Sequence, residues 1–357
     1  MRCLPMVRRD LRRSLQWDGS GVPSTCLPPS RMEMWVISPH RTTRRTLYHR
    51  EAGSQPPPAH FSHASESFLR RDAYVIPYFR QPSLHLFGPV TVYAFGFLVA
   101  LAVIAGSKMA LARCERKKLD PDRCAELIFF TLAAGFLAAH LVSVVAYFPG
   151  QLKEDPLLLL KFWEGISSFG GIAGGVLGVW LFFRFRAPDL DARGRWEYLD
   201  VIAFVFPFAW TVGRLACTVA HDHPGALTTF PLAVSLKTPE AREYIIAVFR
   251  EAGRLADLPG PDVLARLAFH DLGWYEFLYT LLGIVPVFLL LDRRPRTPGF
   301  YVIAFLLLYA PARFCLDFLR IADVRYGGLT PAQYAGIAVF AAALYALRAL
   351  RGNASPG

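Results

Sequence analysis

The sequence predicts an all-α polytopic membrane protein with seven transmembrane helices, and three observations support this prediction. Of the 357 residues, 54% are hydrophobic. Several apolar runs reach about 20 residues, the length that a helix needs to cross the hydrocarbon core of a bilayer. Short loops rich in Lys and Arg separate these runs, as is typical between transmembrane helices. The length alone is compatible with two soluble domains, but the apolar runs exclude that interpretation.

Residues 1–74 differ from the rest of the chain. They are rich in Arg, Ser and Pro, lack apolar periodicity and have no apolar core of a signal peptide. Two interpretations stay open: a disordered tail, or upstream sequence included by a start codon assigned too early. We favour the second, because residues 75–79 resemble the natural beginning of a membrane domain. The expected membrane domain covers residues 75–350, and residues 351–357 form a short tail.

Seven spans are expected within the membrane domain. Their approximate limits are 88–106, 125–148, 167–185, 199–220, 272–291, 299–319 and 334–350. The third is rich in glycine, and small residues let helices approach closely in lipid. Between the fourth and fifth spans, residues 221–271 form a polar segment in which one helix is expected near 239–252.

The basic residues orient the bundle. Lys and Arg gather in the loops after the first, third and fifth spans and at the C-terminal end, which all fall on one side. The positive-inside rule makes that side cytoplasmic, so the predicted topology is N-out and C-in, with residues 221–271 in the periplasm. The net charge of +11 follows from these loops and the N-terminal segment, so no nucleic-acid partner is predicted.

Ionisable residues gather in the other half of the predicted bundle. Arg214 lies about three turns inside an apolar helix, where an arginine costs roughly 2.5–3.5 kcal/mol on insertion scales. Arg313, Asp317 and Arg320 follow i, i+4, i+7 spacing and are expected on one helix face. A structural ion-pair network is one interpretation. Because Arg and His outnumber the acids, we favour an uncompensated cationic patch that binds a phosphate group.

The six cysteines form no CxxC pair and no metal-ligand spacing. The sequence therefore predicts neither a disulfide framework nor a metal site, and nothing in it indicates a cofactor.

Several motifs, in chain order, resemble the prolipoprotein diacylglyceryl transferase family. They are residues 84–89 with Tyr93 and Gly96, residues 165–171, residues 213–215, Tyr275 with Glu276, residues 313–323 and residues 329–333. The resemblance extends over about residues 75–350. It implies a multi-pass enzyme of the bacterial inner (cytoplasmic) membrane whose site faces the periplasmic leaflet.

The resemblance also implies the reaction. Members of this family transfer the diacylglyceryl group of phosphatidylglycerol to the lipobox cysteine thiol of a prolipoprotein and release glycerol phosphate. The expected partners are phosphatidylglycerol, prolipoprotein signal peptides and membrane lipid, with no cofactor.

Site residues follow from the motifs. Arg214, with Arg313 or Arg320, is expected to stabilise the phosphate, since guanidinium binds phosphate bidentately. Tyr93 and Tyr275 are expected to position the glycerol moiety. The candidates for the base are His140, His221 and His223. The expected catalytic residues are His140, Arg214, Arg313 and Tyr275, and the expected substrate-binding residues are Tyr93, Gly170, Gly171, Gly213, Asp222, Glu276 and Arg320.

The sequence also departs from the family pattern. Phe169 stands where the family usually has a histidine, and His140 where it has an arginine. Cys217, Ala220 and Asp222 replace two asparagines and a glutamate. The alternative is therefore an inactive or retargeted paralogue that binds anionic lipid or lipoprotein precursors. A small-solute transporter is disfavoured, because the charges cluster in one leaflet and the sequence shows no inverted repeat.

Overall fold

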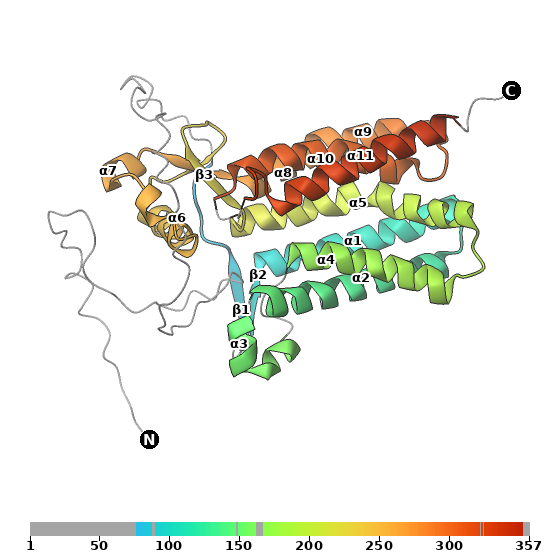
Figure 1. The fold of residues 1–357 in the computed structure, drawn as a ribbon, viewed down its shortest axis with the longest axis horizontal. Helices are drawn as coiled ribbons and strands as arrows, with labels where there is room; N and C mark the ends of the chain where they lie inside the picture. The colour runs from blue at the N-terminus through green and yellow to red at the C-terminus, as the bar shows by residue number, and fades with distance from the viewer. Residues whose placement is uncertain are drawn as a thin grey trace.

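The computed structural model describes residues 76–87, 90–147, 149–161, 167–321, 323 and 325–352. These residues form a bundle of long helices that carries a small mixed α/β cap at one end (Figure 1). The expectation for residues 1–74 lies outside the described residues. We call the end with the cap the cap end, and the end where the Lys- and Arg-rich loops lie the basic end.

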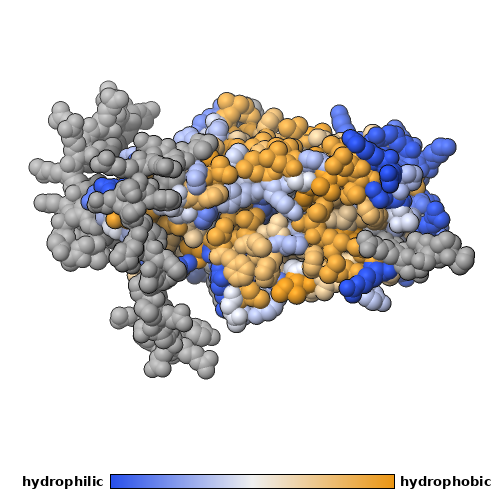
Figure 2. Space-filling model, turned by 90° about the horizontal axis from the view of Figure 1, so that it is seen from above, coloured by the Kyte–Doolittle hydropathy of each residue, from blue (hydrophilic) through white to orange (hydrophobic). Residues whose placement is uncertain are grey.

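The seven expected membrane spans are confirmed in the described residues. The helices long and apolar enough to cross a membrane are Ala94–Arg116, Pro121–Ala146, Ser168–Arg186, Ala192–Ala220, Leu272–Leu291, Phe300–Leu319 and Pro331–Ala349. On the face seen in Figure 2, hydrophobic residues cover most of the surface between the two ends of the bundle. Helices are the expected solution, since every backbone polar group in lipid must find its partner within the protein.

Several spans are built from more than one helical piece. The bundle elements are α1 (Ala94–Arg116), α2 (Pro121–Val142) with a π-helical turn Ser143–Tyr147, α4 (Ser168–Leu181) with a π-helical turn Phe182–Arg186, α5 (Ala192–Ala220), α8 (Leu272–Tyr279), a π-helical turn Thr280–Ile284, α9 (Val285–Leu291), α10 (Phe300–Leu316) with a 3₁₀ turn Asp317–Leu319, and α11 (Pro331–Gly352). Helix α5 occupies the centre, with α1, α2 and α4 on one side and α8 to α11 on the other (Figure 1).

The first span begins six residues later than the sequence indicated. An antiparallel hairpin of β1 (Ser83–Phe87) and β2 (Val90–Tyr93) precedes it, and the Ala94 amide then donates to the Pro82 carbonyl at 2.9 Å. The alternating apolar residues of this stretch favour a strand. At its other end α1 continues through the basic residues to Arg116. A short helix α3 (Pro149–Glu154) and a 3₁₀ turn Pro156–Leu160 connect α2 to α4.

Glycines let α2 and α4 pack backbone to backbone. Gly170, Gly174 and Gly178 lie four residues apart and are all buried. A Cβ atom on Gly170 would lie only 2.6 Å from the Ala138 carbonyl oxygen, and one on Gly178 would collide with the Phe130 carbonyl oxygen. The small-residue interface expected from the glycine-rich third span is confirmed.

The cap is a three-stranded antiparallel sheet with helices beside it. It contains β3 (Pro224–Thr228), β4 (Val234–Ser235) and β5 (Ala268–Asp271) in the order β3-β5-β4, together with α6 (Pro239–Glu251), a 3₁₀ turn Leu255–Asp257 and α7 (Pro261–Leu264). The expected helix near 239–252 is α6, which begins after Thr238, whose side chain accepts a hydrogen bond from the Ala241 amide at 3.2 Å. Tyr244, Ile245 and Phe269 are among the side chains that fill the cap core.

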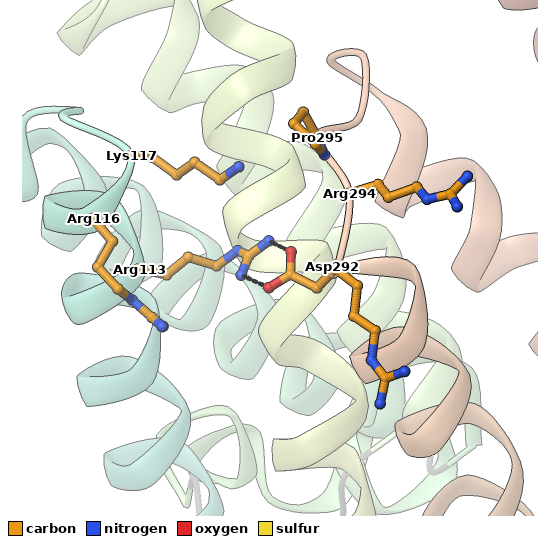
Figure 3. Close-up of a pocket in the computed structure, with 7 residues that line it drawn as sticks. Arg113, Arg116, Lys117, Asp292, Arg294 and Pro295 are labelled. Carbon is orange, nitrogen blue, oxygen red and sulfur yellow. Dashed lines mark hydrogen bonds and ion pairs between the residues drawn. The ribbon is translucent and has the colours of Figure 1, made fainter.

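A buried arginine fastens the basic end. The Arg113 guanidinium of α1 donates two hydrogen bonds to Asp292, which follows α9, at 2.6 and 3.0 Å (Figure 3). It also lies 3.4 Å from the centre of the Phe204 ring of α5. Tyr301 donates a further hydrogen bond to the Asp292 carboxylate at 2.6 Å. The hydrogen bond from Arg113 holds the pKa of Asp292 below its usual range.

Candidate active site

A cavity of about 830 Å³ runs along α1 and α5. Apolar side chains of α1, α2 and α5 make up most of its lining, with Ala110 near one end and Tyr93 at the other. These two residues are seventeen positions apart on the α1 side, or about 25 Å at the helical rise per residue. Most of the polar lining residues gather at the cap end of the cavity, whereas Ser107 lies three residues from Ala110; those at the cap end are Gln81, Thr91, Tyr93, Ser168, Arg214, Asp222 and His223. The cavity is therefore a long apolar space with one polar end.

Arg214 lies at this polar end and is held by α8. Its Nε atom is 2.7 Å from Oε2 of Glu276, and the two side chains are only 9% and 2% exposed. Its guanidinium carbon lies 4.3 Å from the Trp210 ring centre, one turn earlier on α5. A carboxylate and an aromatic face thus fix the guanidinium beside the cavity.

Glu276 is shared between two arginines. Its Oε1 atom pairs with Nη1 of Arg313, and Oε2 accepts a hydrogen bond from the Tyr309 hydroxyl at 2.8 Å. Arg313 also lies 2.9 Å from the Asp317 carboxylate. The expectation of an uncompensated cationic patch is therefore wrong for Arg214 and Arg313. Their charges are balanced by Glu276, which α8 places between them, and by Asp317.

Arg320 pairs with another carboxylate, although its charge also acts on Asp317. Helix α10 ends at Leu316, a 3₁₀ turn follows, and Arg320 has an extended backbone with ψ of 140°. Its Nε atom pairs with Asp323 at 2.8 Å. The expectation that Arg313, Asp317 and Arg320 share one helical face is wrong, because the helix stops before the third of them.

Asp222 and His223 lie at the polar end of the cavity. Nδ1 of His223 is hydrogen-bonded to the Asp222 carboxylate, and Nε2 lies 3.5 Å from Nη1 of Arg214. The same Nη1 atom is 3.5 Å from Sγ of Cys217. All four residues belong to the cavity lining.

These groups also bear on whether a metal ion would bind. The ligand atoms of Cys217, Asp222 and His223 lie within 4.8 Å of one another. However, the Arg214 guanidinium lies 3.5 Å from both the sulfur and the imidazole nitrogen, so a second cation would be repelled there. The arrangement therefore fits a hydrogen-bonded network around a guanidinium better than a cation site.

Two other candidate bases lie elsewhere. His140 is buried in α2 with Nε2 3.2 Å from the Leu158 carbonyl oxygen. His221 is buried with Nδ1 2.7 Å from Oδ2 of Asp271, whose other oxygen caps α8 at the Trp274 amide. Among the described residues, the cavity lining includes neither His140 nor His221.

Tyr275 and the three glycines expected to bind substrate lie in different parts of the structure. The Tyr275 hydroxyl bonds to Nδ1 of His270 at 2.8 Å at the edge of the cap, where burial lowers the pKa of His270. Gly213 and Tyr93 line the cavity. Gly170 packs against α2, and a Cβ atom on Gly171 would lie in ordinary contact with Ala139 at 3.7 Å.

Two residues of the site were missed by sequence reasoning. The Trp210 ring lies against the Arg214 guanidinium, and the Tyr309 hydroxyl donates to Glu276, the carboxylate that binds Arg313. Each precedes its arginine by four residues, so helical spacing was the signal that would have found both.

Comparison with known proteins gives one consistent result. The family model described as prolipoprotein diacylglyceryl transferase matches residues 82–349. The chain is 27% identical over 243 residues to the phosphatidylglycerol–prolipoprotein diacylglyceryl transferase of Chromohalobacter salexigens, covering 67% of this chain and 79% of the relative. It is 26% identical over 259 residues to the protein of that name from Halalkalibacterium halodurans, covering 72% and 82%. It is 24% identical over 271 residues to that of Thermosynechococcus vestitus, covering 75% and 92%.

The matched region contains the cap and the bundle helices described above, apart from the last three residues of α11. It also contains Arg214, Glu276 and Arg313, at positions where the sequence resembles the family. The chain belongs to the prolipoprotein diacylglyceryl transferase family.

Proposed function

We propose that this protein transfers the diacylglyceryl group of phosphatidylglycerol to the cysteine thiol of a prolipoprotein and releases glycerol phosphate. The names of its relatives state this donor and acceptor. Seven helices long and apolar enough to cross a membrane give the protein access to a lipid donor.

The shape and polarity of the cavity carry this proposal. A phospholipid has two acyl chains and one anionic phosphate at the headgroup. The cavity likewise has a long apolar part and, at its polar end, a buried arginine fixed by Glu276 and Trp210. Guanidinium matches phosphate geometry, and a preorganised cation stabilises a charge that develops during a reaction.

The reaction balances as a substitution at carbon. The acceptor sulfur, as thiolate, attacks the glyceryl carbon that carries the phosphate ester. The carbon–sulfur bond forms while the carbon–oxygen bond breaks, and the electron pair leaves on the phosphate oxygen of glycerol phosphate. Arg214 stabilises that oxygen, and Glu276 with Arg313 holds Arg214 in place.

The remaining lining residues fit the glyceryl region. Tyr93 offers a hydroxyl at the polar end, and Gly213 leaves space beside Arg214. Tyr275, Gly170 and Gly171 support the surrounding structure in this proposal. By the positive-inside rule, the basic end lies on the cytoplasmic side of a bacterial inner membrane in this proposal. The polar end of the cavity then faces the periplasmic leaflet, where an exported acceptor presents its cysteine. The topology in this proposal is N-out and C-in.

The test is transfer of labelled diacylglycerol from phosphatidylglycerol to a lipobox peptide by the purified protein in detergent. Arg214→Gln is expected to lower the rate on the order of 100-fold or more, as loss of a transition-state donor does. Arg193→Gln is the control, because Arg193 is exposed and pairs with Glu197 at 3.2 Å on α5 near the basic end. A folded wild-type protein without transfer activity would overturn the proposal.

One observation favours a second candidate function. Phe169, at the position where the family usually has a histidine, is 64% exposed and cannot accept a proton. A paralogue that binds anionic lipid or lipoprotein precursors without transfer would tolerate this residue. The same assay separates the two functions, since the paralogue retains phosphatidylglycerol binding but yields no lipidated peptide.

A further inference from the structure

We infer that the Asp222–His223 pair is the general base that removes the proton from the acceptor thiol. This inference rests on the proposed function and assigns a step which that function leaves without a residue. A free cysteine titrates near pH 8.5, so at neutral pH only a small fraction of an unassisted thiol is ionised.

The hydrogen bonds of His223 fix its tautomer. A carboxylate only accepts hydrogen bonds, so Nδ1 of His223 carries the proton that it donates to Asp222. Nε2 then carries the lone pair, which agrees with its position 3.5 Å from an N–H group of Arg214. A carboxylate that holds an imidazole in one tautomer, with the other nitrogen at the reaction site, is the recurring arrangement of histidine bases.

The backbone around His223 is fixed from both sides. His221 follows the last residue of α5 and has a left-handed backbone with φ of 51°. This conformation turns the chain at the polar end of the cavity. The Leu272 amide, at the start of α8, donates to the His223 carbonyl at 3.0 Å. Pro224 then opens β3. The two helices that carry Arg214 and Glu276 therefore also position His223.

The charged and titratable groups around His223 suit a base. They are Asp222 beside it, Arg214 and Cys217 from α5, and Glu276 from α8. Arg214 repels the imidazolium that forms after proton transfer, but the Asp222 carboxylate hydrogen-bonded to the ring and the Glu276 carboxylate paired with Arg214 offset this repulsion. Arg214 favours the thiolate over the thiol in the same space and then stabilises the phosphate.

The other histidines of the described region near the cap end have structural partners. His221 is buried against Asp271 and stacks on Tyr78 at 5.1 Å between ring centres. His270 bonds to Tyr275, and His85 bonds to the Thr91 hydroxyl at 2.8 Å. Of the three candidates drawn from the sequence, His223 is the one that lines the cavity in the described residues.

The proton is accounted for in each step. It moves from the acceptor S–H group to Nε2 of His223, the thiolate displaces glycerol phosphate as written above, and the imidazolium returns the proton to the leaving phosphate or to water. Neither an oxidant nor a metal ion is needed.

The experiment compares the transfer rates of wild type and His223→Gln between pH 6 and 9. At pH 7 the variant is expected to be slower by about 100- to 10,000-fold, the usual contribution of a general base. The difference between the transfer rates of wild type and variant is expected to narrow as the pH approaches the thiol pKa of about 8.5, because the acceptor thiol then ionises without a base. Asp222→Asn is a positioning variant and is expected to show a smaller loss with the same narrowing. Imidazole in the buffer is expected to restore part of the activity of His223→Ala.

Phosphatidylglycerol binding and the melting temperature are measured for each variant, so that loss of folding or of the donor is seen separately. A His223→Gln variant that keeps the wild-type rate and pH profile would overturn the inference. So would a pH profile altered by His140→Gln instead, or a wild-type activity that EDTA removes and zinc restores. An inactive wild type would count against the proposed function itself, and not specifically against this base.

Discussion

Nε of Arg214 on α5 lies 2.7 Å from Oε2 of Glu276 on α8. Both side chains are almost fully buried, and Glu276 also pairs with Arg313 of α10. The Glu276 carboxylate thus links three helices at the polar end of the cavity. In a low-dielectric interior such a cluster is sensitive to the loss of any member, because an unpaired buried charge remains.

Replacing Glu276 is therefore expected to destabilise the bundle. Glu276→Ala leaves two guanidinium groups without their shared carboxylate, and breaking a buried pair in this way costs about 3–5 kcal/mol. Glu276→Gln retains the shape and part of the hydrogen bonding, so its loss is expected to be smaller. Thermal unfolding in detergent measures both. Glu197→Ala is the control, since Glu197 pairs with an exposed arginine. Equal melting temperatures for Glu276→Ala and Glu197→Ala would contradict this account.

The α2–α4 interface gives a prediction with a matched pair. A Cβ atom on Gly178 would collide with the Phe130 carbonyl oxygen, whereas one on Gly175 would lie 3.8 Å from Thr131, an ordinary contact. Gly178→Ala is expected to lower stability by about 1–3 kcal/mol, the usual range for overpacking. Gly175→Ala is expected to be neutral or slightly stabilising, because alanine favours the helix. A greater loss of stability in Gly175→Ala than in Gly178→Ala would refute the backbone contact.

The sequence predicted the spans well because lipid leaves few alternatives. An apolar run of about 20 residues must satisfy its own backbone groups, and a helix does so locally. The density of glycine in the third span likewise indicated close packing, and the buried Gly170, Gly174 and Gly178 confirm it. Such features depend on residues near one another in the chain.

The site was harder to predict because it depends on partners far apart in the chain. Counting charges along the sequence gave an excess of cations, but Glu276 pairs with two arginines far from it in the chain, and Asp317 balances the charge of the second. Helical spacing placed Arg320 with Arg313, but the chain leaves the helix after Leu316. Both errors arose where tertiary contacts or a helix end decide the geometry.

Burial decides the value of the arginine pairs near the basic end. Arg113 and Arg186 both bind a carboxylate through two nitrogens, but the Arg113 side chain is 4% exposed and that of Arg186 is 53% exposed. Arg113→Ala also removes the contact with Phe204. It is expected to lower the unfolding free energy by about 2–4 kcal/mol, whereas Arg186→Ala is expected to have a much smaller effect, because water screens the exposed pair. Chemical denaturation in detergent distinguishes the two. Equal losses would mean that burial is irrelevant here.

Acidification is expected to weaken the cap through His270. Burial lowers its pKa in the folded protein, so the unfolded chain binds the proton more readily. The stabilising contribution is complete above the unfolded pKa of about 6.5 and is lost as the pH falls toward the lowered folded value. Hydrogen exchange of the β5 amides, measured between pH 7.5 and 5.5 and corrected for the intrinsic rate, reports the effect. His270→Gln should flatten this dependence, and an equally steep dependence in that variant would assign the effect to another group.

Gly213 allows a test of the cavity that leaves the ion pairs intact. It lies one residue before Arg214 and lines the cavity, and a Cβ atom added there has no atom within 4 Å. The Cβ atom of Gly213→Leu therefore meets no neighbour, and the rest of the side chain takes up space beside the guanidinium. We expect phosphatidylglycerol binding and transfer to fall by about tenfold or more, since a steric block of about 1.4 kcal/mol already has that effect. The melting temperature should stay equal or rise, because glycine disfavours a helix interior.

Gly336→Leu on α11 is the matched control for Gly213→Leu. A Cβ atom at Gly336 also meets nothing within 4 Å, and Gly336 is not among the described residues that line the cavity. If Gly213→Leu binds and transfers the lipid like the control, the cavity beside Arg214 is not where the donor lies.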